Sequence, residues 1–172
     1  MRLLTVTTAL LLTGPTAAQT PQPAQNCAAT TPALPPELTG WPNRAPLTAA
    51  TIALAASQAT LAIGRSAQLR LSPTTAVRYP VRPGRPAAPS TNGGIASFTV
   101  ARPGTYRVAL GSGMWIDVVQ GGQAIASTTH AHGPACSGIR KIVDFRLRPG
   151  RHLLQISGGK EPNVTILVVP VD

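Results

Sequence analysis

Residues 98–112 read FTVARPGTYRVALGS, and residues 145–158 repeat this pattern, with one residue fewer, as FRLRPGRHLLQISG. Each copy alternates apolar and polar side chains on both sides of a Pro-Gly pair, which is typical of two β-strands joined by a turn. Successive side chains of a strand point to opposite sides, so each copy has one apolar face. We expect these faces to form the core: Phe98, Val100, Tyr106, Val108 and Leu110, with Phe145, Leu147, His152, Leu154 and Ile156.

Further strands are predicted on both sides of the two copies. They are expected as two strands around a turn within residues 59–71, as a strand pair at residues 114–119 and 124–126 around the Gly121-Gly122 turn, and as a last strand at residues 164–171. Because 18 Pro and 16 Gly interrupt the 172 residues, long helices are not expected. Eight or nine short strands predict an all-β fold, an antiparallel β-sandwich or jelly roll.

The N-terminal residues have the pattern of a secretory signal peptide. Arg2 is followed by an apolar run over residues 3–12 and then by small residues up to Ala18. The run falls well short of the roughly 20 residues that cross a bilayer. We therefore predict a signal peptide at residues 1–18, cleaved near Ala18, and a protein of the periplasm or the extracellular space without a transmembrane segment after processing.

Residues 19–46 are rich in Pro, Thr, Gln and Ala, which predicts an extended arm ahead of a single domain at residues 47–172. Trp41 is expected to pin this arm to the domain. In an oxidising compartment, Cys27 and Cys136 are expected to form a disulfide. The alternatives are that Cys136 binds a metal or that both thiols are free.

The chain is strongly basic: 15 Lys and Arg residues against five Asp and Glu residues give a formal net charge of +10. Outside the cytoplasm this charge favours an anionic envelope component or a glycan as the partner, and not nucleic acid. It could also serve only to keep the protein soluble. No oligomeric state is indicated by the sequence.

The Pro-rich segment of residues 72–94 is the first candidate contact surface. Pro at this density favours polyproline II and turns over paired strands, so charged side chains should project from a stiff loop. The alternative is a solvated loop without a partner. The candidate ligand-binding residues are Tyr79, Arg78, Arg82 and Arg85 in this segment, and Arg140 in a second loop.

His130-x-His132 is the second candidate, because the two imidazoles of such a pair can bind a metal when they point to one side of a strand end. A third ligand would be needed, and the spacing does not choose among Asp117, Asp144, His152 and Cys136. Two histidines that form hydrogen bonds in a structured loop are the alternative. No G-x-S-x-G motif or Gly-rich phosphate loop is found in the sequence.

Two resemblances bear on function. Residues 94–171, with strand, Pro-Gly, strand patterns around WIDVVQGGQAI, resemble the β-sandwich modules of secreted bacterial enzymes, such as pre-peptidase C-terminal and carbohydrate-binding domains. The stretches ALGSGMWIDVV and HAHGPACSGIRKIVDFRLRPGRHLLQISG look like short exported bacterial proteins labelled homogentisate 1,2-dioxygenase. That second resemblance implies Fe(II) bound by His130 and His132, with His152, Asp117 or Asp144 completing the site, and homogentisate as the substrate.

Two functional hypotheses follow from these observations. The first is an exported, non-catalytic β-sandwich module without a cofactor, which binds an anionic envelope ligand or a glycan. The competing hypothesis is an Fe(II)-dependent dioxygenase. They differ in what they require of the structure, since the enzyme needs converging metal ligands and the binding module needs an accessible surface or pocket.

Overall fold

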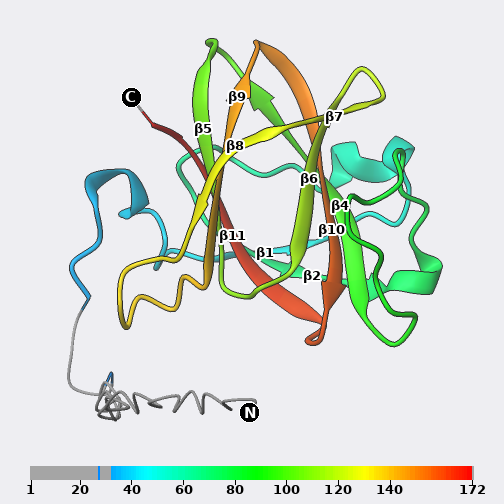
Figure 1. Cartoon of the computed structure of the whole chain (residues 1–172), viewed down its shortest axis with the longest axis horizontal. Helices are drawn as coiled ribbons and strands as arrows, with labels where there is room; N and C mark the ends of the chain where they lie inside the picture. The colour runs from blue at the N-terminus through cyan, green and yellow to red at the C-terminus, as the bar shows by residue number, and fades with distance from the viewer. Residues whose placement is uncertain (1–26, 28–31, 172) are drawn as a thin grey trace, which may run out of the picture.

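The computed structural model describes residue 27 and residues 32–171 of the chain. The described part contains eleven strands in two sheets that pack face to face, which confirms the predicted all-β sandwich (Figure 1). The predicted signal peptide, and residues 19–26 and 28–31 of the predicted arm, lie outside the described residues. Within the described residues, no helix is long and apolar enough to cross a bilayer.

The two sheets contain six and five strands. The six-stranded sheet has the order β1 (Ala45–Thr48), β2 (Ala67–Arg70), β11 (Asn163–Val171), β5 (Gly104–Leu110), β9 (Lys141–Leu147) and β8 (Ser127–Ala131). The five-stranded sheet has the order β3 (Ser72–Pro73), β4 (Asn92–Val100), β10 (Gly150–Gly159), β6 (Trp115–Gln120) and β7 (Gln123–Ile125). Within residues 32–171, three short 3-10 helices lie outside the sheets: η2 (Pro36–Leu38), η3 (Ala53–Gln58) and η4 (Thr74–Ala76).

Most strands pair as the two arms of one long hairpin. β6 pairs with β7 at its tip, and further out β5 pairs with β9, β4 with β10, and β2 with β11, all antiparallel. Neighbouring pairs along this hairpin belong to opposite sheets, so the hairpin is rolled into a jelly roll. The tip residues Gly121 and Gly122 have φ angles of 59° and 78°, which glycine adopts without steric cost.

The strand partners differ from the sequence prediction in two places. The two strands of each Pro-Gly copy do not pair with each other, because β4 and β10 lie in one sheet while β5 and β9 lie in the other. Each Pro-Gly segment therefore crosses between the sheets. Within residues 59–71, only β2 is a strand, and its partners are β1 and β11. Leu61 is buried in the core without belonging to a strand, which satisfies the apolar pattern there.

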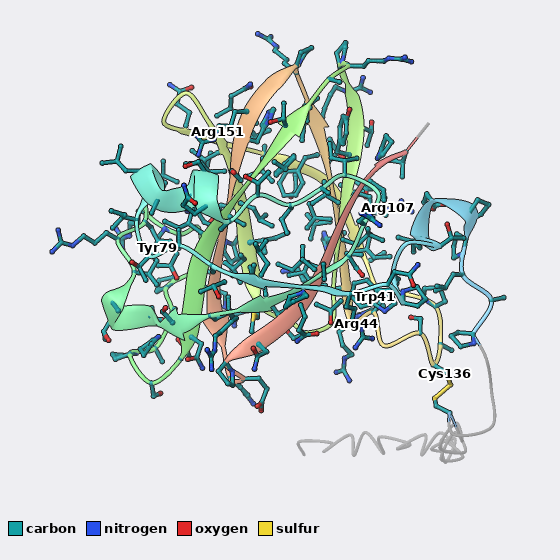
Figure 2. The ribbon with its side chains drawn as sticks, turned by 180° about the vertical axis from the view of Figure 1, so that it is seen from behind. Trp41, Arg44, Tyr79, Arg107, Cys136 and Arg151 are labelled. Atoms are coloured by element: carbon teal, nitrogen blue, oxygen red, sulfur yellow. A yellow bond between two sulfur atoms is a disulfide. The ribbon has the colours of Figure 1, made fainter. Side chains whose placement is uncertain are left out.

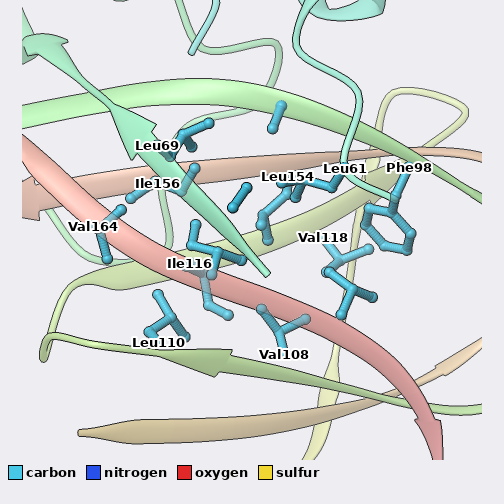
Figure 3. Packing of buried hydrophobic residues seen from close by; sticks show 14 of the residues in the cluster. Leu61, Leu69, Phe98, Val108, Leu110, Ile116, Val118, Leu154, Ile156 and Val164 are labelled. Carbon is cyan, nitrogen blue, oxygen red and sulfur yellow. The ribbon is translucent and has the colours of Figure 1, made fainter. Parts of the chain in front are cut away.

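The core fills the space between the two sheets (Figure 3). All ten residues predicted for it are buried, and none has an exposed fraction above 6%. Phe98 and Phe145 are among the largest side chains buried in this core. Burial of one Val, Leu, Ile or Phe side chain contributes about 1.5–3 kcal/mol, so these alternating faces supply much of the driving force for folding.

The N-terminal segment is fastened to the outer face of the six-stranded sheet. Trp41 is buried against Leu38, Ile139 and Leu167, and its Nε1 donates to the carbonyl oxygen of Ser137 at 3.0 Å. This confirms the predicted anchoring role of Trp41. Cys27 and Cys136 form a disulfide, as predicted, and this bond joins the segment to the loop that follows β8 (Figure 2).

Candidate functional site

A cavity of about 590 Å³ opens at the edge of the sandwich, where β6 and β7 lie opposite β8 and β9. Its volume falls in the range typical of small-molecule sites, about 300–1,000 Å³. It combines an apolar floor with an aromatic ring and several polar groups. This Trp115 pocket is defined by Trp115, Ile116, Asp117, Ile125, Ser127, His130, Lys141, Val143 and Phe145. A larger hollow, of about 800 Å³ beside β1 and η3, has no aromatic residue in its lining.

The pocket exists because the two sheets end at different places. β7 has only three residues and pairs with residues 118–120, which leaves the first half of β6 without a partner on that side. β8 extends the opposite sheet, and all five of its residues are exposed. Ser127 and His130 are the strand partners of Phe145 and Val143, so they lie on the same inward face and border the opening.

Trp115 is held in place by its neighbours although its side chain is partly exposed. Its Nε1 donates to Oδ1 of Asp117 at 2.9 Å, and Oδ2 of Asp117 accepts from the backbone N of Gly84 at 3.2 Å. A Cβ atom at position 84 would lie 3.1 Å from Cζ2 of Trp115, so glycine allows this loop to approach the ring closely. The indole is therefore a fixed wall of the pocket.

Positive charge borders the same ring. Nζ of Lys141 lies 5.1 Å from the centroid of the Trp115 ring and donates to the carbonyl oxygen of Met114 at 2.9 Å. Burial lowers the pKa of Lys141 below its usual 10.5, and the charge of Arg85 lowers this pKa further, while Asp117 opposes the shift. An anion bound between Lys141 and Arg85 would relieve their mutual repulsion.

The predicted ligand-binding residues separate into different environments. The hydroxyl of Tyr79 donates to the carbonyl oxygen of Ile156 at 2.8 Å, and burial raises the pKa of Tyr79 to about 12. This hydroxyl therefore anchors the loop to β10. Arg78, Arg82 and Arg85 are exposed, as expected, and Arg85 acts electrostatically on Lys141 at the Trp115 pocket. Arg140 is also exposed, but it lines a separate hollow beside Cys136.

The two histidines of the predicted metal pair face different surroundings. His130 lines the Trp115 pocket, whereas His132 lines the hollow beside Cys136, with its Nδ1 3.0 Å from the carbonyl oxygen of Arg140. Alternation places residues i and i+2 on one side only while the strand continues, and β8 ends at Ala131. The sequence prediction that both imidazoles point to one side does not account for this strand end.

The other predicted metal ligands lie elsewhere. His152 is buried in the core, where its ring stacks on Phe98 with the centroids 5.3 Å apart, and burial lowers its pKa. Asp117 accepts a hydrogen bond from Trp115, and Cys136 forms the disulfide with Cys27. Within the described part of the chain, no three His, Cys, Asp or Glu side chains form a group that could hold a metal ion. The Fe(II) ligand set implied by the dioxygenase resemblance therefore does not fit this arrangement.

Asp144 lies on the outer face of the six-stranded sheet and is fully engaged there. Nε and Nη2 of Arg107 each donate to one of its carboxylate oxygens at 2.9 Å, and Thr129 Oγ1 donates at 3.0 Å. Nη1 of Arg107 also donates to Glu37 in η2 at 2.8 Å, which ties the N-terminal segment to the sheet. The bond from Arg107 holds the pKa of Asp144 below its usual 3.8, although burial opposes this shift.

Replacing Asp144 by Asn is expected to lower the free energy of unfolding at neutral pH by about 2 kcal/mol, less than for a fully buried pair because Arg107 is 24% exposed. Since the folded pKa is depressed, this stabilisation is present above pH 3.8 and is lost as the pH falls through the folded value. Urea unfolding of both proteins from neutral to strongly acidic pH measures the difference. A difference that does not shrink at acidic pH would contradict the ion-pair explanation.

No protein-family model and no curated protein sequence matches the chain. The two resemblances noted in the sequence therefore stay predictions. The functional assignment depends on the geometry of the Trp115 pocket.

Proposed function

We propose that this protein is an exported, non-catalytic β-sandwich module whose Trp115 pocket binds an acidic glycan of the cell envelope or extracellular space. The single observation that carries the proposal is the fixed, partly exposed Trp115 ring beside Lys141 at a cavity of about 590 Å³. A flat aromatic surface and a cation at one pocket suit a ligand that has both an apolar face and a negative charge.

The chemistry of the pocket matches a sugar acid. The ring of a pyranose can pack its C–H face on an indole, and Nε1 of Trp115 is already bonded to Asp117, so the indole offers its ring and not its N–H group. Ser127 and His130 supply further polar atoms for sugar hydroxyl groups. Lys141, reinforced by Arg85, would pair with a carboxylate, sulfate or phosphate of the ligand.

The proposed location has two supports. Structural disulfides form and persist mainly in oxidising compartments, and Cys27 and Cys136 are joined in this protein. The N-terminal pattern of Arg2, an apolar run and small residues is that of a signal peptide. The net charge of +10 also favours an anionic partner, since it raises the local concentration of anions around the pocket.

Replacing Trp115 by Ala is expected to weaken binding of an acidic polysaccharide about tenfold, because the ring contact is lost. Lys141→Gln should weaken the binding of acidic polysaccharides and leave the binding of neutral polysaccharides of similar sugar composition unchanged. The measurement is a binding screen of acidic and neutral polysaccharides against the wild-type protein and the variants. Arg146→Gln is the matched control, because it also removes one positive charge, from the exposed outer face of β9.

Two results would contradict the proposal. One is that no acidic polysaccharide in the screen binds the wild-type protein. The other is that Arg146→Gln weakens binding as much as Lys141→Gln does, which would mean that overall charge and not the pocket attracts the ligand. Thermal unfolding of each variant shows whether the fold is retained, so a loss of binding can be separated from a loss of structure.

A further inference from the structure

The N-terminal part of η3 exposes apolar side chains at a second place on the protein. Among the described residues, the exposed large hydrophobic side chains are Leu54, at 90%, and Ile52, at 39%. Leu54 belongs to η3, and Ile52 is the residue immediately before it. A leucine side chain exposed to this extent forgoes the favourable free energy of burial.

The backbone that carries Leu54 is well anchored. Ala56 is fully buried against Val77 and Ile95 on the outer face of the five-stranded sheet. The carbonyl oxygen of Ala56 also accepts a hydrogen bond of 2.8 Å from Oγ of Ser97 in β4. Because η3 is fixed to the sheet by these contacts, it holds Leu54 in the solvent on an ordered turn.

The surface next to Leu54 is apolar at its centre and basic at its rim. A hollow of about 240 Å³ beside η3 is lined by Ala53, Pro80, Val119, Leu153 and Arg151, together with residues 120–122 at the turn between β6 and β7. Arg151 and Leu153 lie on the same face of β10, since they are two residues apart. Arg78 is the bridge partner of Ile52, and its backbone N donates to the carbonyl oxygen of Thr51 at 2.8 Å.

Figure 2 shows Arg151 and Tyr79 near η3, at the end of the molecule opposite Cys136. We define the Leu54 patch as Ile52, Leu54, Arg78, Pro80 and Arg151. Among the residues that the structure describes, no acidic residue belongs to the patch or lines the hollow. Glu37 and Asp144 are paired with Arg107 on the other sheet, and Asp117 is bonded to Trp115.

We propose that the Leu54 patch docks the protein onto an anionic phospholipid surface. A protruding leucine can enter the boundary between headgroups and acyl chains, while the neighbouring Arg78 and Arg151 pair with lipid phosphates. The charge complementarity selects this occupant, because the patch and the whole protein are basic and no carboxylate of the described residues borders the hollow. This surface is separate from the Trp115 pocket, so the two proposals can fail independently.

Co-sedimentation with vesicles tests the proposal. The protein, expressed from the whole 172-residue sequence, is mixed with vesicles of phosphatidylcholine alone or of phosphatidylcholine and phosphatidylglycerol, at physiological ionic strength. We expect binding only to the mixed vesicles. Leu54→Ser should lower the partition coefficient about tenfold, and Arg151→Ser about fivefold, because one leucine insertion or one phosphate contact is lost.

Arg146→Ser provides the matched control. It removes the same charge as Arg151→Ser from the outer face of the opposite sheet, and we expect it to change the partition coefficient less than about twofold, because charges far from the surface are screened. Leu54 is almost fully exposed, so its replacement should leave the thermal unfolding temperature unchanged.

Four outcomes would overturn the proposal. The wild-type protein fails to sediment with the mixed vesicles; Leu54→Ser sediments as well as the wild type; or Arg146→Ser reduces binding as strongly as Arg151→Ser, which indicates diffuse charge attraction. The fourth outcome is that the protein captures another protein through Leu54 but does not sediment with vesicles. The patch would then bind a protein partner and not a lipid surface. Selective loss with Leu54→Ser and Arg151→Ser supports docking by this patch.

Discussion

Reduction of the Cys27–Cys136 disulfide is expected to lower the free energy of unfolding by about 4–5 kcal/mol, since the bond closes a loop between residues separated by 109 positions. The closed loop restricts the unfolded chain, and its loss restores that chain's conformational freedom. A loss of this size is a large part of the total stability of an ordinary domain, about 5–15 kcal/mol. Urea unfolding with and without a reductant, followed by tryptophan fluorescence, measures the effect.

The double variant Cys27→Ser, Cys136→Ser serves as the control for this prediction. It should match the stability of the reduced wild-type protein and should not respond to the reductant. The N-terminal segment keeps two other attachments in both forms, the buried Trp41 and the Glu37–Arg107 ion pair. If reduction changes the stability by less than about 1 kcal/mol, the loop-closure explanation is wrong.

Replacing Phe98 by Ala is expected to destabilise the protein by about 3–5 kcal/mol, because a large core side chain is lost and a cavity remains. Phe98 is fully buried, and its ring stacks on His152 across the pairing of β4 with β10. The substitution therefore also removes the aromatic partner of a buried imidazole. Equilibrium unfolding in urea measures the change in the free energy of unfolding.

Thr99→Ala is the matched control for the Phe98 substitution. Thr99 is the next residue of β4, and its side chain is exposed on the opposite face of the strand. We expect this control to change the free energy of unfolding by less than about 0.5–1 kcal/mol. Similar losses for both variants would mean that the alternation of β4 does not separate a core face from a solvent face, contrary to the structure.

The alternating sequence predicts the buried faces well, but it predicts the strand partners correctly only for the pair around the Gly121-Gly122 turn. The faces of β4, β5, β9 and β10 follow directly from the period of two, because a side chain's orientation is a local property of the strand. Whether a strand pairs across the next turn or with a strand further along the chain depends on how the two sheets pack. Neither the Arg102-Pro103-Gly104 nor the Arg148-Pro149-Gly150 segment carries a local signal that distinguishes a hairpin turn from a crossing between sheets.

The candidate site was only partly predictable from the sequence. His130 and Arg85 were singled out by residue type, and both are associated with the Trp115 pocket. Trp115 and Lys141 were not predicted as ligand residues, because the pocket results from the short β7 and the unpaired half of β6. One local feature of the sequence sets Lys141 apart. Two of the 15 basic residues are lysines, and Lys141 lies at the start of a strand.

The metal hypothesis shows how residue type can mislead when orientation is ignored. Asp144 lies between Val143 and Phe145, which both face the core, so alternation alone places its carboxylate on the outer face. His130, which borders the inward opening, lies on the other side of that sheet. The same alternation places His152 among core residues, since Leu154 and Ile156 follow on its side of β10. These constraints were present in the sequence.

The most direct test of the Trp115 pocket is an NMR titration of the two indole N–H signals with an acidic polysaccharide fragment. The chain has two tryptophans, and Trp41 is a built-in control because it is buried and bonded to Ser137 on the other side of the six-stranded sheet. We expect the Trp115 signal to shift in a saturable manner while the Trp41 signal stays in place. Saturable binding that leaves the Trp115 signal unmoved would contradict the assignment of this pocket as the binding site.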